Sequence, residues 1–368
     1  MNLLYSDVEE QLRASVRDLL AARAPLSGAV ARAESDRPYE PALWTALARE
    51  LGVAGLAVPE SAGGHGGSWR EVAVVAEELG RAVAATPFLG STVLATAAAT
   101  AVPSARELVG ALAAGTSTAV LVVPLSTPPG SAFPGQVSFD GTHATGQVRS
   151  AADAAAADLL LVPAAGPAGP VLLSVEAGAA RCEPVTSLDL TRPLSNVHLD
   201  AAAGSVVAEG DGAVRALEAA LLAGAVVLAS EQVGLAEHGL DSTVAYLKER
   251  YQFGRQIGSF QALKHRCADL WANLAQARAV ARYAAACLAD GTADGAADAP
   301  VAAALAQAYC SPLAVTAAEE CIQLHGGIGF TWEHPAHLYL KRAKADSIAF
   351  GGAARHHARL GELVGLPA

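Results

Sequence analysis

The chain has 368 residues, which is long enough for two or three domains, each with its own core. A formal net charge of −11 argues against nucleic acid as a partner, and 52% apolar with only 5% aromatic residues favours a mainly helical interior. No charged segment followed by an apolar one opens the sequence, so we expect a cytoplasmic protein. The longest apolar run, residues 219–230, is too short to cross a bilayer, so no membrane partner is expected. Five cysteines without a C-x-x-C pair predict free thiols and no metal site.

Residues 1–115 are predicted to form a helical domain. Residues 6–7 can cap a first helix, and a second helix passes through residues 43–51 and ends at a glycine. A third helix is predicted over residues 69–81. The glycine cluster at 63–67 lacks the Lys-Ser/Thr of a phosphate-binding loop, so we interpret it as a mobile turn.

Residues 116–208 differ in composition and pattern from the helical part, and they are predicted to form a central β-domain, a barrel or sandwich. Turns rich in proline and glycine separate short β-rich runs. These runs are residues 119–123, 159–162, 171–175 and 197–199. Gly141 and Thr142, after an aspartate, indicate a hairpin.

Residues 209–368 are predicted to be helical again. One long helix runs from residue 214 to about 251, a second holds residues 263–277, and a linker at 291–299 precedes a third. Antiparallel helices with short connections predict a four-helix bundle.

Two segments of this last region carry the most specific signal. Residues 246–265 read Y-L-K-E-R-Y-Q-F-G-R-Q-I-G-S-F-Q-A-L-K-H, and residues 321–330 read C-I-Q-L-H-G-G-I-G-F. A guanidinium such as that of Arg250 donates two parallel hydrogen bonds to phosphate oxygens. A glycine-rich turn between helices leaves backbone N–H groups accessible to an anionic diphosphate.

Both segments resemble the acyl-CoA dehydrogenase family, flavoenzymes that oxidise acyl-CoA thioesters, and weaker similarity extends over nearly the whole chain. The resemblance implies a tetramer in which an N-terminal helical domain, a central β-domain and a C-terminal four-helix bundle occupy residues 1–115, 116–208 and 209–368. It also implies FAD as cofactor, an acyl-CoA substrate, and an electron-transfer flavoprotein as electron acceptor.

The resemblance assigns FAD contacts to both segments. In the family the arginine and phenylalanine of the first segment face the FAD of a neighbouring subunit, and a glutamine follows on the next helix. The matching residues are Arg250, Phe253, Gln261 and, in the glycine-rich turn, Gln323, Gly326 and Gly327. His325, between them, is expected to fill space rather than to act as a base.

The catalytic base is missing from the position where the family has it. The chemistry needs a carboxylate to remove the α-proton of the thioester, and Phe350 stands at the usual glutamate position. Some members carry the base ten residues before a conserved glycine on the long helix, and Gly224 stands there. Two nearby acids remain. Glu231 lies among apolar residues, where burial would raise its pKa, but we favour the alternative that it hydrogen-bonds within the bundle. Asp346 is expected to face solvent. Glu231 is the only candidate base we name.

The central domain also departs from the family around the flavin ring. Residues 124–130 and 148–152 replace the usual motifs, and only Ser126 or Thr127 is suited to contact a flavin. Gly224 and its small neighbour Ala223 suggest room for a bulky or branched acyl chain.

Three hypotheses remain open. The chain is a non-catalytic subunit that completes the FAD site of a base-carrying paralogue in a mixed tetramer. Alternatively, it is an active dehydrogenase with a relocated base at Glu231, in a homotetramer. Thirdly, it catalyses another flavin reaction on the same fold, such as oxidation or monooxygenation. The first best explains why Arg250 and the glycine turn persist while both base positions are empty.

Overall fold

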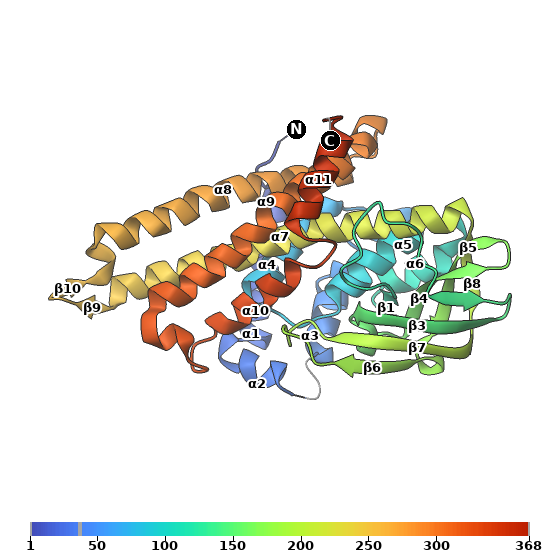
Figure 1. Cartoon of the computed structure of the whole chain (residues 1–368), viewed down its shortest axis with the longest axis horizontal. Coiled ribbons are helices and arrows are strands. Elements are labelled where there is room, and N and C mark those ends of the chain that lie inside the picture. Colours follow the sequence, from blue (N-terminus) through green and yellow to red (C-terminus); the bar gives the residue numbers. More distant parts are fainter. Residues whose placement is uncertain (1, 36–38, 367–368) are drawn as a thin grey trace.

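The computed structural model describes residues 2–35 and 39–366. The N-terminal part is helical (Figure 1). Its α-helices are α1 (Asp7–Arg23), α2 (Ala29–Ala33), α3 (Pro41–Thr45), α4 (Trp69–Arg81), α5 (Thr96–Thr100) and α6 (Arg106–Ala113). Ser6 and Ser68 close reciprocal capping boxes at the starts of α1 and α4, so both helices begin where the sequence predicts. A π-helical segment, Phe88–Ala95, leads directly into α5.

A single sheet forms the middle of the chain. Its strands are β1 (Ala119–Leu121), β2 (Val137–Phe139), β3 (His143–Ala152), β4 (Leu159–Gly166), β5 (Gly169–Glu176), β6 (Arg181–Val185), β7 (Leu194–Ala203) and β8 (Ser205–Glu209). The spatial order is β6-β7-β3-β2-β4-β5-β8, and β1 pairs in parallel with β4. The four β-rich runs fall on β1, β4, β5 and β7, and the predicted hairpin joins β2 to β3.

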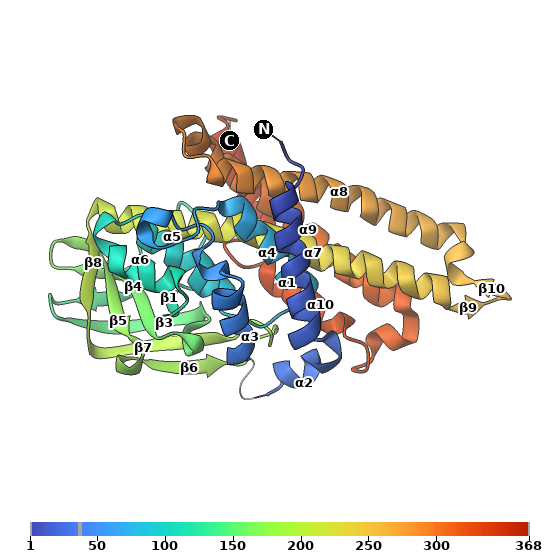
Figure 2. The same ribbon diagram turned by 180° about the vertical axis from the view of Figure 1, so that it is seen from behind.

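The C-terminal part is a bundle of long helices. They are α7 (Asp211–Glu249), α8 (Gln261–Ala289), α9 (Ala293–His325), α10 (Ala336–Asp346) and α11 (Ala353–Leu363). A small hairpin of β9 (Tyr251–Gln252) and β10 (Arg255–Gln256) joins α7 to α8 at the far tip of the bundle (Figures 1 and 2). The predicted linker at 291–299 is wrong, because Thr292 caps α9 through its hydroxyl and the helix begins at once.

These elements confirm the predicted class, a mainly helical protein with a central sheet. The domain boundaries at residues 115 and 208 remain a prediction. Helix α7 runs from the sheet to the tip of the bundle, with α1 and α4 on one side of it (Figure 2). This single helix therefore connects the interior with the exposed end of the molecule.

Two helices are long and apolar enough to cross a membrane by length and composition. They are α7 and the helix that begins with α9, and their most apolar windows are 67% and 61% buried inside the protein. Burial of this kind is also typical of the core helices of a multi-helix domain.

Candidate active site

The two positions at which the family carries its base lie against each other in the interior. A Cβ atom placed on Gly224 would lie 2.5 Å from Cζ of Phe350 and 2.7 Å from Cδ2 of Leu94. The ring of Phe350 is 0% exposed. The expected room beside Gly224 is therefore absent, because the phenyl ring and Leu94 fill it.

Backbone contacts hold the Phe350 ring in this place. Phe350 has φ 53°, a left-handed conformation that is uncommon for a bulky residue. Its N–H donates to the Leu125 carbonyl at 2.8 Å, and Nε2 of His356 donates to its carbonyl oxygen at 2.9 Å. A residue held at both backbone groups and fully buried is a fixed part of the core.

The loop after β1 closes the space on the sheet side. Leu125 N–H donates to the Ser150 carbonyl at 3.0 Å, while the Leu125 carbonyl accepts from Phe350. Direct backbone bonds thus join the two segments that replace the family's ring-side motifs. Ser126 is exposed beside them, and its suitability as a flavin contact remains a prediction.

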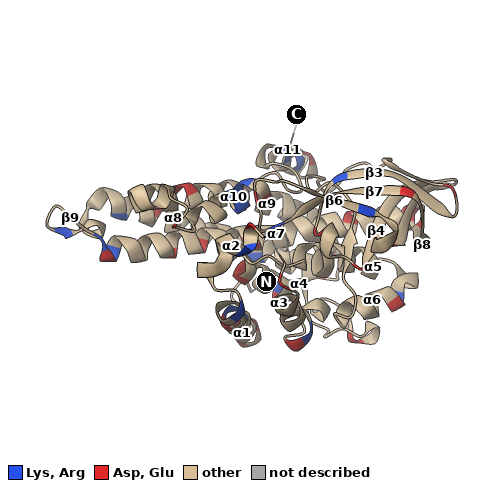
Figure 3. Cartoon of the chain, turned by 90° about the horizontal axis from the view of Figure 1, so that it is seen from below, with Lys and Arg blue, Asp and Glu red and all other residues tan. Residues whose placement is uncertain are grey.

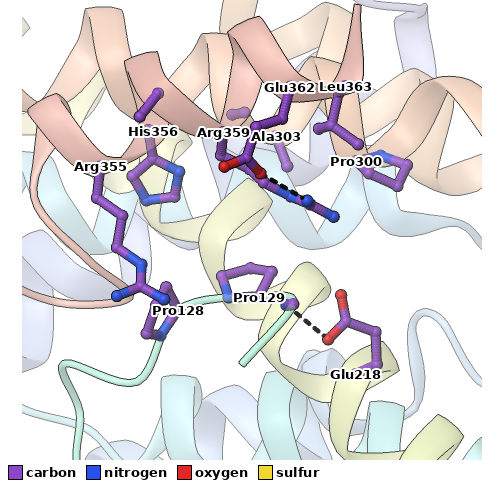
Figure 4. Close-up of a pocket in the computed structure, with 13 residues that line it drawn as sticks. Pro128, Pro129, Glu218, Pro300, Ala303, Arg355, His356, Arg359, Glu362 and Leu363 are labelled. Atoms are coloured by element: carbon purple, nitrogen blue, oxygen red, sulfur yellow. Dashed lines mark hydrogen bonds and ion pairs between the residues drawn. The ribbon is translucent and has the colours of Figure 1, made fainter. Parts of the chain in front are cut away.

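A cavity of about 210 Å³ lies on the other side of this loop (Figure 4). Pro128 and Pro129 form one wall, Glu218 of α7 another, and Arg355 and Arg359 of α11 a third. Small-molecule sites typically have volumes of about 300–1,000 Å³. The cavity is therefore smaller than a typical cofactor pocket.

Glu231 belongs to a buried ion-pair cluster. Its carboxylate accepts from Nε of Arg342 at 2.6 Å and from Nη2 of Arg192 at 2.7 Å. Burial raises the pKa of Glu231, but the two guanidinium groups outweigh burial and hold the pKa below its ordinary value. Glu231 thus hydrogen-bonds within the protein, as the favoured interpretation has it, and the alternative of a raised pKa is wrong. A carboxylate bound in this way is a weak proton acceptor.

Asp346 is also in this cluster, so the expectation that it faces solvent is wrong. It is the last residue of α10, is fully buried, and forms an ion pair with Arg192. Arg192 lies in the connection between β6 and β7, and sequence reasoning did not single it out. The only signal was a charged pair, Asp189 and Arg192, in a stretch otherwise rich in apolar residues and proline.

The residues expected to contact FAD lie at the opposite, open end of the bundle. Arg250 follows the last residue of α7, and Phe253, in the β9–β10 hairpin, is 91% exposed. Gln261 is the exposed first residue of α8. The Arg250 side chain has no partner among the residues that the structure describes. Its guanidinium is therefore available to an external anion.

The glycine-rich turn lies beside this hairpin end. The Tyr246 ring of α7 stacks on His325 of α9 at 4.6 Å, which places the two helix ends together. Gly326 has φ 62°, and a Cβ on either Gly326 or Gly327 would meet nothing within 4 Å. Gln323 is exposed in the last turn of α9. The surface is thus open, and His325 fills space as expected.

Several cationic side chains lie in the same part of the molecule. All four lysines of the chain lie in the C-terminal bundle, at positions 248, 264, 341 and 344. Figure 3 shows basic residues at the tip around β9. Arg250 and Arg255 at this end are exposed cations that can contact an anionic ligand.

Comparison with known proteins identifies the class. Residues 6–104 match the N-terminal domain of acyl-CoA dehydrogenases, and residues 210–363 match the C-terminal domain. Acyl-CoA dehydrogenase IpdE2 of Mycolicibacterium smegmatis is 36% identical over 346 residues, which cover 94% of this chain and 95% of the relative. The chain belongs to the acyl-CoA dehydrogenase family.

Two solved structures are similar over the full length. The ChsE4-ChsE5 complex from Mycobacterium tuberculosis has a chain that is 27% identical, with a TM-score of 0.86 and 100% of both chains covered. A variant of the Tcur3481-Tcur3483 steroid ACAD is 29% identical, with a TM-score of 0.83 and 98% of both chains covered. The chain thus has the fold of proteins that include a two-component complex.

Proposed function

We propose that this chain is a non-catalytic subunit of a mixed acyl-CoA dehydrogenase oligomer and completes the FAD site of a base-carrying paralogue. The observation that carries the proposal is the contact between Phe350 and Gly224, because it leaves no proton acceptor at either base position and fills the space between them. A phenyl ring cannot accept the α-proton of a thioester.

The open bundle end supports the second half of the proposal. Bound FAD supplies the hydride acceptor of the family reaction. In this proposal Arg250 donates to the diphosphate of that cofactor, and the turn at Gly326 and Gly327 lets the dinucleotide approach the backbone. Around Leu125, by contrast, backbone hydrogen bonds occupy the place of the chain's own ring-side motifs, which does not fit a second flavin ring.

The relatives support a mixed assembly and suggest a substrate class. One similar chain belongs to the ChsE4-ChsE5 complex and another to a steroid ACAD. We infer that the assembled enzyme oxidises a bulky, steroid-derived acyl-CoA thioester and passes its electrons to an electron-transfer flavoprotein. The acyl group is then bound by the partner, because Phe350 and Leu94 fill the equivalent space in this chain.

The visible spectrum of the purified protein tests this proposal. The chain alone is expected to be colourless, and co-purification with a base-carrying paralogue is expected to give flavin absorbance that acyl-CoA bleaches anaerobically. Stoichiometric FAD and turnover in the lone chain would refute the proposal.

A second experiment separates this proposal from a relocated base at Glu231. In the co-purified complex, Glu231→Gln should leave the rate of flavin bleaching per bound flavin within about twofold, because the carboxylate is occupied by two guanidinium groups. Abolished bleaching with full flavin content would instead identify Glu231 as the base.

A further inference from the structure

The buried cluster around Glu231 contains more acids than bases. It joins α7, α10 and the connection between β6 and β7, and each of its side chains is at most 4% exposed. Its members are three carboxyl groups, Asp189, Glu231 and Asp346, and two guanidinium groups, Arg192 and Arg342. Arginine stays protonated in proteins. With every carboxyl ionised the cluster would carry one uncompensated negative charge in the interior, which is costly.

Two of the three carboxyl groups are well satisfied. Glu231 accepts from both guanidinium groups. Asp189 accepts from the N–H and hydroxyl of Thr191 at 2.8 and 2.6 Å and lies 3.3 Å from Nη1 of Arg342. Both side chains thus accept hydrogen bonds from several donors.

Asp346 is different, because only one of its oxygens has a donor. Oδ1 accepts from Arg192, while Oδ2 is buried and has no hydrogen-bond partner among the described residues. Gln232 contacts Asp346 through Nε2, which lies 3.4 Å from the Asp346 carbonyl oxygen, and Oε1 of the same amide also lacks a partner in the described part of the chain. Two neighbouring residues thus each have an acceptor without a donor.

A proton on Asp346 changes the charge of the cluster and the hydrogen-bonding character of Oδ2. It removes the surplus charge and turns Oδ2 into a donor. Flipping the Gln232 amide would not do so, because Nε2 also lies 3.4 Å from Oε1 of Gln307, and an oxygen placed there would face two acceptors.

We propose that Asp346 is a proton-binding site, protonated on Oδ2 in the folded chain, and that the cluster is thereby neutral overall. Burial is the main cause that raises the pKa of Asp346, to about 7; the charges of Glu231 and Asp189 add to it, and Arg192 and Arg342 oppose it. Asp153 is a second buried carboxyl group with a raised pKa, again chiefly because of burial. Unlike Asp346, it accepts hydrogen bonds at both oxygens, from the Gly90 N–H and the Tyr39 hydroxyl.

This proton makes the fold sensitive to pH. An aspartate in the unfolded chain has a pKa of about 3.9, well below that of folded Asp346. Between these values the folded state binds one more proton than the unfolded state, so stability falls as pH rises from about 4 to about 7. Asp346 ends α10 only four residues before Phe350.

Infrared spectroscopy of the full chain tests the proposal. The folded protein should show a protonated-carboxyl carbonyl band that disappears with a midpoint near pH 7. Asp346→Asn should remove this band, because the amide is neutral at every pH, while the exposed control Asp200→Asn should keep it. The urea midpoint of the wild type should decrease as the pH is raised from 5 to 8, and that of Asp346→Asn should decrease less. The difference in the pH dependence of the free energy of unfolding should correspond to about one bound proton.

Three results would overturn the proposal. One is a folded wild type without a carbonyl band that titrates near pH 7, and another is an Asp346→Asn chain in which the band that titrates near pH 7 keeps its full amplitude. The third is an Asp346→Asn chain that does not fold at pH 5, since the amide has the shape of the protonated acid and supplies the same donor.

Discussion

The turn around Phe350 and the end of the bundle around Arg250 differ in burial and in hydrogen bonding. At the turn, the side chain is fully buried and both backbone groups of Phe350 are hydrogen-bonded. At the bundle end, Phe253 is 91% exposed and the glycines of the α9 turn have no neighbour where a side chain would be. The Phe350 turn is closed by contacts within the chain, whereas the bundle end is exposed to solvent.

The difference indicates what each region is for. A buried aromatic ring packed against a glycine is typical of a protein core. Replacing Phe350 by a smaller, acidic side chain would leave a cavity beside Gly224. Exposed aromatic residues rimmed by cations are instead typical of surfaces that another molecule covers. At the bundle end these are Tyr251, Phe253, Phe330 and Trp332. Under the proposed function, the bundle end is the half of a site that another subunit completes.

The closed region should be the more sensitive to truncation. Phe350→Ala should lower the free energy of unfolding of the lone chain by about 4–5 kcal/mol, because Gly224 has no side chain that can move into the cavity. Urea unfolding would measure this, with Phe330→Ala, at a 75% exposed position, as the control that changes it by less than about 0.5 kcal/mol. Equal losses in the two variants would mean that the Phe350 turn is not packed as described.

The ion-pair cluster should be nearly as sensitive. Arg192→Ala leaves Glu231 with Arg342 as its remaining partner and removes the hydrogen-bond donor of the Asp346 carboxyl group, and it should cost about 3–4 kcal/mol at pH 7. The matched control is Arg149→Ala, at an exposed position in β3, where less than about 0.5 kcal/mol is expected. A small effect at Arg192 would show that water enters the cluster and compensates its charges.

Local signals in the sequence were sufficient for most of the helices and for the loss of the base. Ser68 followed three residues later by Glu71 fixes the start of α4, and the spacing around Phe350 shows that no glutamate is present. The segment at 291–299, by contrast, is predicted to be a linker, and this prediction is wrong. Its alanines and the cap at Thr292 make it a helix instead.

The contacts of the interior could not be predicted from local pattern. Gly224 and Phe350 are 126 positions apart, and Arg192 meets Asp346 across 154 positions. Each residue has several plausible surroundings until the helices pack. The sequence therefore located the candidate acids, but the burial and pairing that make Glu231 a poor base depend on tertiary structure.

Substitutions in the exposed bundle end should affect FAD binding, which is measured in the complex with a partner subunit. In the complex with a base-carrying paralogue, Arg250→Ala should weaken FAD binding by about 10- to 100-fold, because one charge-assisted contact to the diphosphate is lost. Arg215→Ala, near the start of the same helix, is the matched control and should leave it unchanged. Fluorescence titration of the apo-complex with FAD would measure both, and equal affinities would remove Arg250 from the site.

The smallest expected effects come from the glycine-rich turn after α9. Two alanine substitutions there distinguish the need for a left-handed backbone from the need for an open surface. Gly326→Ala should cost about 1–2 kcal/mol in the lone chain, because φ 62° disfavours a side chain. Gly327 is not left-handed and a methyl group there has no neighbour, so Gly327→Ala should change stability by less than about 0.5 kcal/mol. The same methyl group should still weaken FAD binding in the mixed complex several-fold, because it would stand where the cofactor approaches the backbone. Unchanged affinity would mean that the turn is only a helix connection, and the open end would then owe its flavin contacts to Arg250 and its hairpin alone.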